Sequence, residues 1–262
     1  MNNKDIKIVF FDVDGTLIQL GTNAMTANTL KMLHSLKEQK IKICICSGRS
    51  PVQMPALPGS SFDAYIAFTG SYCFDREGII YSNPISQEDV RQILQNAREL
   101  DRPVVAATDK DMSANGVDEN LRKYYAFAGI DLKEDPNFAE VIKKPVYQIM
   151  AGCTIDQRKA IVKNTQNARV AAWWDRACDV MPADGDKGKG VELVLKHFGI
   201  DRSNAMAFGD GDNDLEMFEA VDHPIAMGNA SDNLKKIAED TCGRVDEDGI
   251  YHYLAGQKII AP

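Results

Sequence analysis

The chain has 262 residues, of which 44% are hydrophobic and 26% charged; these proportions are ordinary for a soluble globular protein with one large or two modest domains. The net charge of −8 argues against a general nucleic-acid or membrane binder. The six cysteines form no CxxC pair, and no secretory signal or long apolar segment is found, so we expect a cytoplasmic protein with reduced thiols.

The first predicted strand covers residues 6–11 and ends in two acids. Its sequence, IKIVFF, is apolar and rich in β-branched and aromatic side chains, as in buried strands. Asp12 and Asp14 follow, and Gly15 ends the strand. In an extended backbone the two carboxylates would point to the same side, which favours a site for a hard cation such as Mg²⁺. An exposed turn is the alternative.

Helices and strands alternate over the next part of the chain. A helix is expected from Thr26, its capping residue, to about Gln39. A strand over 41–46 then leads into Ser47-Gly48-Arg49, and another apolar run covers 65–68. A hairpin is expected over 73–81. This alternation predicts a parallel sheet.

The pattern changes over residues 83–182, which resemble a self-contained α+β domain. Ser86 begins a capping box for a helix. Strands are expected at 103–107, 146–151, 168–174 and 177–181, the last two as a hairpin, and helices at 121–128 and 156–166. About a hundred residues suffice for a domain. The sequence therefore predicts an α/β core formed by residues 1–82 and 183–262, with a second domain inserted at 83–182.

The α/β pattern resumes at Lys187 and leads to a second acidic cluster. A helix is expected from Lys187 to His197, with Gly199 as its C-terminal signal. The next elements are strands at 204–208 and 224–227 and helices at 213–221 and 231–239. The acids of Gly209-Asp210-Gly211-Asp212-Asn213-Asp214 follow the first of these strands. An EF-hand calcium loop is excluded, because its twelfth position requires glutamate and is Val221 here.

Four motifs resemble those of the haloacid dehalogenase (HAD) superfamily of phosphohydrolases. They are DxDGT at 12–16, SGR at 47–49, the glycine-flanked Lys187, and GDGxND at 209–214. Their order is similar to that of the Cof-type branch, subfamily IIB with a C2 cap, and the resemblance extends to MGNA at 227–230 and DEDGI at 246–250. It implies a Rossmann-like parallel-sheet core with the first strand at its centre, and an inserted α+β cap that selects the substrate.

The resemblance also implies roles for individual residues. Asp12 would be the nucleophile that forms an aspartyl-phosphate, and Asp14 the general acid and base. Asp210 would complete a Mg²⁺ site with Asp12 and the backbone carbonyl of Asp14. Lys187 would neutralise the phosphate, and Asp214 would support the metal or orient Lys187. The expected phosphate- and substrate-binding residues are Ser47, Gly48, Arg49 and Asn213.

Several of these residue types also fit a purely structural role. A serine after a strand is usually a cap or turn residue, Arg49 could bind a surface carboxylate, and Lys189 is a rival for the role of Lys187. Trp173-Trp174 could be a sugar platform, although paired aromatic residues in a strand more often pack. The four histidines show no metal-ligand spacing, and we expect them to be structural.

The sequence thus predicts a Mg²⁺-dependent phosphatase of small phosphorylated metabolites, such as sugar phosphates, acting as a monomer or weak homo-oligomer. One alternative is a phosphomutase of the same superfamily, which would pass the phosphoryl group to a second hydroxyl. Another is a non-catalytic protein that binds phosphorylated metabolites. The presence of Asp12, Asp14, Lys187 and Asp210 together argues against the second alternative.

Overall fold

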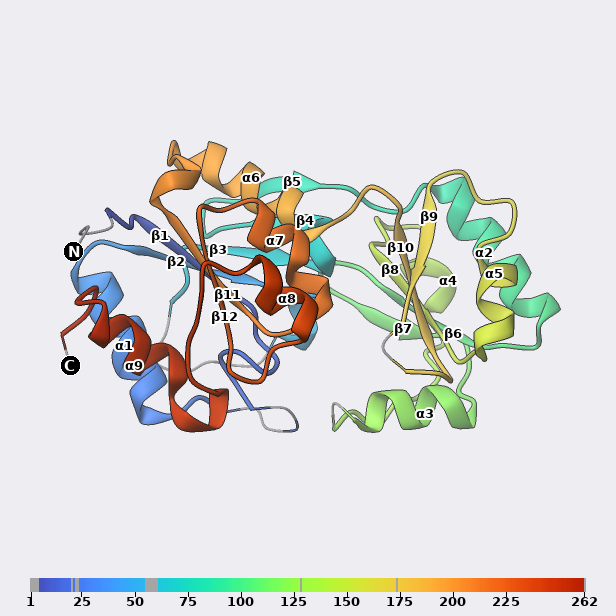
Figure 1. The fold of residues 1–262 in the computed structure, drawn as a ribbon. Helices are drawn as coiled ribbons and strands as arrows, with labels where there is room; N and C mark the ends of the chain where they lie inside the picture. Colours follow the sequence, from blue (N-terminus) through green and yellow to red (C-terminus); the bar gives the residue numbers. More distant parts are fainter. Residues whose placement is uncertain are drawn as a thin grey trace. The chain divides into compact units, whose positions relative to one another are not determined.

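The computed structural model describes residues 5–19, 21, 24–54, 61–127, 129–172 and 174–261. The chain divides into two compact units, shown in Figure 1. The first unit comprises Met1–Gly48, Pro55–Ser82 and Asp186–Pro262, and the second Arg49–Met54 and Asn83–Gly185. The short segment Arg49–Met54 thus belongs to the second unit, although its sequence position places it inside the first.

The first unit contains an eight-stranded sheet in the order β13-β12-β11-β1-β2-β3-β4-β5. Its strands are β1 (Ile8–Phe11), β2 (Lys42–Cys46), β3 (Ala64–Ala67), β4 (Tyr72–Phe74), β5 (Ile79–Ser82), β11 (Ala205–Gly209), β12 (His223–Ala226) and β13 (Asp240–Thr241). Neighbouring strands from β13 to β3 run parallel, whereas β4 and β5 pair antiparallel. The predicted parallel α/β core is confirmed, with β1 inside the sheet between β11 and β2.

Side chains buried on both faces hold β1 in the middle of this sheet. All four residues of β1 are fully buried, and the Phe11 ring stacks on Phe208 of the neighbouring strand at 5.6 Å. Parallel strands of this kind are covered by helices on both faces. The helices of this unit are α1 (Ala27–Glu38), α6 (Lys187–Phe198), α7 (Leu215–Glu219), α8 (Asp232–Ile237) and α9 (Gly249–Gly256). Within the described ranges, no helix has the length and apolar character needed to cross a membrane.

Two helix boundaries follow the signals in the sequence. The Thr26 side chain accepts a hydrogen bond from the Thr29 N–H and caps α1, as predicted. At the end of α6, Gly199 adopts a left-handed conformation with φ of +63°, and its N–H bonds to helix carbonyls. Glycine adopts this conformation without the penalty that a Cβ atom imposes, so α6 ends where the sequence predicts.

The second unit is built on a five-stranded antiparallel sheet in the order β7-β6-β8-β10-β9. Its strands are β6 (Val104–Ala107), β7 (Met112–Ala114), β8 (Gln148–Ala151), β9 (Ala168–Ala171) and β10 (Cys178–Pro182), and its helices α2 (Gln87–Glu99), α3 (Glu119–Ala126), α4 (Phe138–Val141) and α5 (Arg158–Ile161). The apolar face of α2, including Val90 and Ile93, belongs to one hydrophobic cluster with residues of β6, β8 and β10. The predicted hairpin of the last two strands is confirmed as β9 and β10.

Two predicted elements of this unit are shorter than expected. The helix predicted at 156–166 forms only over α5. It does not continue because the Asn96 amide takes up the carbonyls of Ile161 and Lys163, and because Asn164 adopts a left-handed conformation. The strand predicted to reach residue 174 ends at Ala171. Trp173 lies outside the described residues. Trp174 lies outside the strand, and its ring contacts Phe127 edge-to-face at 5.5 Å.

Candidate active site

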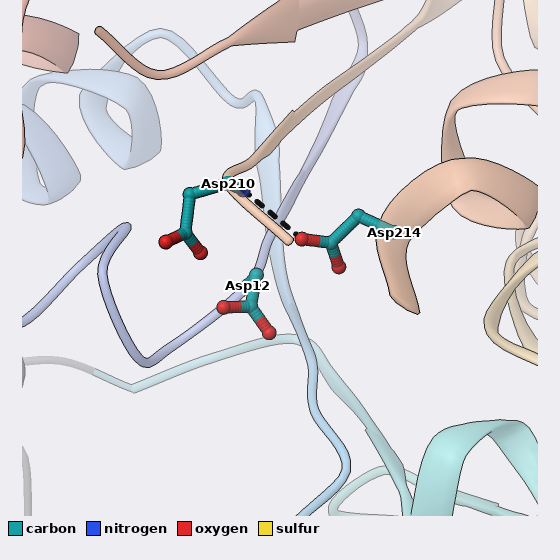
Figure 2. A group of neighbouring side chains, drawn as sticks. All are labelled: Asp12, Asp210 and Asp214. Carbon is teal, nitrogen blue, oxygen red and sulfur yellow. Dashed lines mark hydrogen bonds between the residues drawn. The ribbon is translucent and has the colours of Figure 1, made fainter. Parts of the chain in front are cut away.

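Three carboxylates gather at one edge of the parallel sheet in the first unit. Asp12 follows β1, Asp210 follows β11, and Asp214 closes the turn Asp212–Asp214 after β11. Each contributes one oxygen to a group whose members all lie within 4.8 Å of one another (Figure 2). Because β1 and β11 are parallel neighbours, their carboxyl ends meet at this edge, which is where ligands bind in open α/β sheets.

Lys187 places a buried positive charge against this group. Its side chain is fully buried, and Nζ lies 2.6 Å from Asp12 Oδ1 and 2.5 Å from Asp214 Oδ1. Burial alone would lower the pKa of Lys187, but the carboxylates of Asp12 and Asp214 raise it above its ordinary value. The lysine therefore stays charged. Lys189, the alternative in the sequence, instead places its Nζ over the Tyr81 ring at 5.1 Å.

Burial, together with the neighbouring like charges, raises the pKa of Asp12 and Asp210. Burial raises the pKa of Asp12 to about 8, while Lys187 favours the ionised form and Asp214 and Asp210 oppose it. For Asp210, burial followed by the repulsion of Asp214 raises the pKa to about 6. A divalent cation bound here would favour the ionised form of both groups.

Asp214 is already occupied by protein donors. Its Oδ1 accepts from Lys187, and its Oδ2 accepts from the backbone N–H groups of Asp210 at 3.0 Å and Gly211 at 3.1 Å. The first of the backbone contacts is the dashed line in Figure 2. Asp214 therefore shapes the turn after β11 and holds Lys187, which leaves Asp12 and Asp210 as the carboxylates better placed to bind a cation.

The donor set fits a hard metal ion. Among the described residues, the clustered metal-binding side chains at this edge are all carboxylates, without a histidine or cysteine in the group. Carboxylate oxygens suit Mg²⁺, Ca²⁺ or Mn²⁺, whereas Zn²⁺ favours nitrogen and sulfur ligands. The cluster can therefore bind a divalent metal of this class.

Asp14 lies inside the turn that follows β1. The N–H groups of Leu17 and Ile18 both donate to the Val13 carbonyl, and Gly15 has a φ of +80°. A Cβ atom at Gly15 would lie 2.2 Å from Asp210 Oδ2, so this close approach of backbone to carboxylate requires glycine. Asp14 is half-buried, and its carboxylate is not one of the three in the group. Its expected metal contact, through the backbone carbonyl, stays a prediction.

The predicted phosphate-binding residues fall into three places. Ser47 is buried directly after β2; its N–H donates to the Ile66 carbonyl, and its own carbonyl accepts from the Thr69 N–H. Gly48 is the last residue of that segment of the first unit. Asn213 is exposed on the turn after β11. Arg49 belongs to the second unit, where its Nη1 donates to the Gln53 carbonyl at 2.9 Å. Their contacts with a substrate stay predictions.

Asn229 has no individual role in the sequence motifs, yet it contacts the loops that follow β1 and β11. Its amide nitrogen donates to the Gly15 carbonyl at 2.9 Å and to Asp210 Oδ2 at 3.2 Å, and its Oδ1 accepts from the Val245 N–H at 3.1 Å. The signal for this residue is the MGNA segment at 227–230, which the resemblance includes without assigning it a function.

Comparisons with known proteins agree with this fold. Residues 9–254 match the family model of the haloacid dehalogenase-like hydrolases. The chain is 34% identical to "Putative phosphatase YkrA" of Bacillus subtilis (strain 168), across 94% of this chain and 95% of that protein. These findings confirm the predicted enzyme class, a phosphatase-type hydrolase.

Two solved structures are similar over nearly the whole chain. One is the HAD subclass IIB sugar phosphatase BT4131, with 29% identity and a TM-score of 0.83 over 97% of this chain and 100% of that chain. The other is a protein from Geobacillus kaustophilus HTA426, with 30% identity, a TM-score of 0.86 and the same coverage of 97% and 100%. The chain belongs to the haloacid dehalogenase-like hydrolases.

Proposed function

We propose that this protein is a Mg²⁺-dependent phosphatase that hydrolyses small phosphorylated metabolites through an aspartyl-phosphate on Asp12. The observation that carries the proposal is the buried Lys187 ammonium, 2.6 Å from Asp12 Oδ1, at the sheet edge that also carries Asp210. Sugar phosphates are the proposed substrate class, supported by the similarity to BT4131, which is described as a sugar phosphatase.

Asp12 acts as the nucleophile in the proposed mechanism. Its Oδ1 bonds to Lys187, so the other oxygen attacks phosphorus while the ester P–O bond breaks. Asp14 donates a proton to the departing alcohol oxygen. It then removes a proton from the water that attacks the aspartyl-phosphate, which releases inorganic phosphate and restores the Asp12 carboxylate.

The remaining site residues bind and neutralise the phosphate group. Mg²⁺, held by Asp12, Asp210 and the Asp14 carbonyl, would screen the repulsion between the phosphate and the attacking carboxylate. Lys187 supplies a fixed charge that burial makes more effective than an exposed lysine would be. Ser47 and Asn213 offer donors to phosphate oxygens, and Gly48 lets the backbone approach them.

The second unit is proposed to select the substrate. It contains none of the three carboxylates of the cluster and does not contain Lys187. Arg49 is a further proposed contact to the substrate phosphate, because guanidinium groups bind phosphate through paired hydrogen bonds.

Product analysis over a panel of phosphorylated metabolites tests the function. We expect Mg²⁺-dependent release of inorganic phosphate from at least one sugar phosphate, which EDTA abolishes and added Mg²⁺ restores. An isomerised phosphate ester without free phosphate would instead identify a phosphomutase. Tight binding of phosphorylated metabolites with neither product would identify a non-catalytic binding protein.

A further inference from the structure

Two cysteines of the second unit lie in direct contact. Cys178 begins β10 and pairs with Ala151 at the end of the antiparallel neighbour β8, and Cys153 comes two residues after Ala151. Because side chains alternate along extended backbone, this spacing places both thiols on the same side of the sheet. Their sulfur atoms are 2.9 Å apart, and both residues are buried. The proposed phosphatase mechanism uses neither of them.

Two arginines make the surroundings of Cys153 electropositive. Its pKa is lowered first by the hydrogen bond from the Cys178 thiol and then by the charges of Arg158 and Arg102, while burial opposes this. Arg158 Nε is buried and makes no hydrogen bond to any other group in the described part of the chain. A thiolate at Cys153 would therefore place a negative charge next to the half-buried Arg158 guanidinium, whose Nε–H is buried without another partner.

The other four cysteines have different surroundings. Burial raises the pKa of Cys44, Cys46, Cys73 and Cys242, which keeps these thiols protonated. Cys44 and Cys46 lie two residues apart on one strand, yet no sulfur–sulfur contact is found between them in the described residues. The thiolate form, which is the reactive one, is therefore favoured at Cys153 alone among the six.

We propose that Cys153 and Cys178 are a redox modification site, at which hydroperoxides convert the two thiols into a reversible disulfide. The Cys153 thiolate attacks one peroxide oxygen, the O–O bond breaks, and the leaving oxygen takes a proton to become water or an alcohol. The sulfur of Cys178 then attacks the Cys153 sulfenic acid; the S–O bond breaks, and the Cys178 proton leaves with the oxygen as water. Two thiols and one hydroperoxide thus give one disulfide, one molecule of water from the sulfenic acid, and one molecule of water or alcohol from the leaving oxygen of the peroxide.

The geometry favours this disulfide and restricts the oxidant. A disulfide bond is about 2.05 Å long, so the sulfur atoms need to approach by less than about 1 Å. Cys153 belongs to the hydrophobic cluster of this unit, but residues 154–156, which directly follow it, are exposed, so a local opening of this segment would expose the thiol. Hydrogen peroxide is small enough to reach a thiol at this depth after a slight local opening, whereas a bulky aromatic disulfide reagent is not. The bond would link residues 153 and 178 across the segment that contains α5 and β9.

Peroxide titration of the full-length protein tests the proposal. The reduced protein is treated with increasing hydrogen peroxide, then denatured, alkylated and digested for mass spectrometry. We expect two of the six thiols to be lost, a peptide pair joined through Cys153 and Cys178, and recovery of all six thiols with dithiothreitol. Alkylation of both cysteines at peroxide concentrations that already oxidise the methionines would overturn the proposal, and so would a disulfide between any other pair.

Two variants and a control separate the reacting thiol from the resolving thiol. In Cys178→Ser, oxidation should stop at a sulfenic acid on Cys153, which dimedone traps. In Cys153→Ser, the five remaining thiols should all stay alkylatable. The matched control Cys242→Ser removes another buried cysteine and should still form the Cys153–Cys178 disulfide. A dimedone adduct on a different cysteine of Cys178→Ser would contradict the assignment of Cys153 as the reactive thiol.

Discussion

The ammonium group of Lys187 lies 2.6 Å from Asp12 Oδ1, in a place where neither side chain has more than 8% of its surface exposed. The partners come from distant parts of the chain, 175 residues apart, and meet because α6 begins beside the carboxyl end of β1. A buried ion pair contributes little net stability, because removing both charges from water costs about as much as their attraction returns. Its effect here is electrostatic: Lys187 favours the ionised form of Asp12 in a site where burial favours the neutral acid.

Replacing Lys187 tests this role. Lys187→Met keeps the length of the side chain but leaves Asp12 and Asp214 without their shared cation. We expect kcat/KM to fall by about 10²–10³-fold or more, the usual loss when a fixed stabilising group is removed from an active site. The free energy of unfolding of the first unit should also fall, by about 3–5 kcal/mol, because one partner of a buried ion pair has been removed.

Lys189→Met is the matched control, because Lys189 lies in the same helix with its ammonium over the Tyr81 ring. Steady-state kinetics and urea unfolding should show little change in this variant. Equal losses of activity in the two variants would contradict the assignment of Lys187.

Asp214 is predicted to act through the shape of the turn and through Lys187. Asp214→Asn removes the negative charge next to Lys187. It also replaces one acceptor oxygen with an NH2 group, which faces either Lys187 or the N–H groups of Asp210 and Gly211. We expect the Mg²⁺ concentration for half-maximal rate to rise and kcat to fall. Asp212→Asn is the control, since Asp212 is exposed and contacts Ser231 and Asn233 instead. An unchanged Mg²⁺ requirement in Asp214→Asn would show that this carboxylate does not support the metal.

Asn229 is predicted to position Asp210. Asn229→Ala removes its bonds to the Gly15 carbonyl, to Asp210 Oδ2 and to the Val245 N–H, so both loops at the metal site lose a fixed contact. Changes of this kind typically weaken metal binding by about 10–100-fold. Calorimetric titration with Mg²⁺ measures this without relying on turnover. Asn233→Ala, which removes an amide bonded to exposed Asp212, should leave the affinity unchanged.

The buried carboxyl group of Asp179 should make the stability of the second unit depend on pH. Its carboxylate is buried and accepts from the Tyr124 hydroxyl at 2.9 and 3.0 Å, and burial raises its pKa from 3.8 to about 6 despite that bond and one from Gln148. The folded protein therefore holds this proton more tightly than the unfolded chain does. This proton adds up to about 3 kcal/mol to the free energy of unfolding. The contribution is fully present below about pH 4 and is lost as the pH rises to about 6.

Asp179→Asn should remove this contribution, because an amide does not titrate in this range. Urea unfolding between pH 4 and 7, followed by tryptophan fluorescence, measures the difference, since both tryptophans fall within the sequence range of this unit. Asp156→Asn, at an exposed position of the same unit, is the control. A stability difference between Asp179→Asn and the native protein that stays constant with pH would contradict the prediction.

The sequence predicts the parts of this fold that depend on local patterns. The buried run before Asp12, the Thr26 cap and Gly199 each carry a local signal, and each lies where expected. The strand β13 and the helix α9 were not predicted, because their formation depends on distant contacts. Asp248 precedes α9 with a φ of +54°, and its carboxylate accepts from Thr26 and Asn28, more than two hundred residues earlier.

The active site shows the same difference between local sequence signals and contacts from distant parts of the chain. The motifs identify Asp12, Lys187 and Asp210 as candidates, because each stands at the end or start of a recognisable element. The bonds of Asn229 and the two occupied oxygens of Asp214 depend on how three loops meet in space, so no spacing in the sequence reveals them. The Cys153–Cys178 contact is of the same kind, since it follows from the register of β8 and β10.

The most direct test of the proposed function is acid quenching of the enzyme during turnover of a ³²P-labelled or mass-labelled phosphate ester. We expect the labelled phosphate on Asp12, as an acyl phosphate that hydroxylamine cleaves, and we expect Asp12→Asn to carry none while remaining folded. Phosphate on a serine or histidine with Asp12 unmodified, or full turnover by Asp12→Asn, would contradict the proposed function.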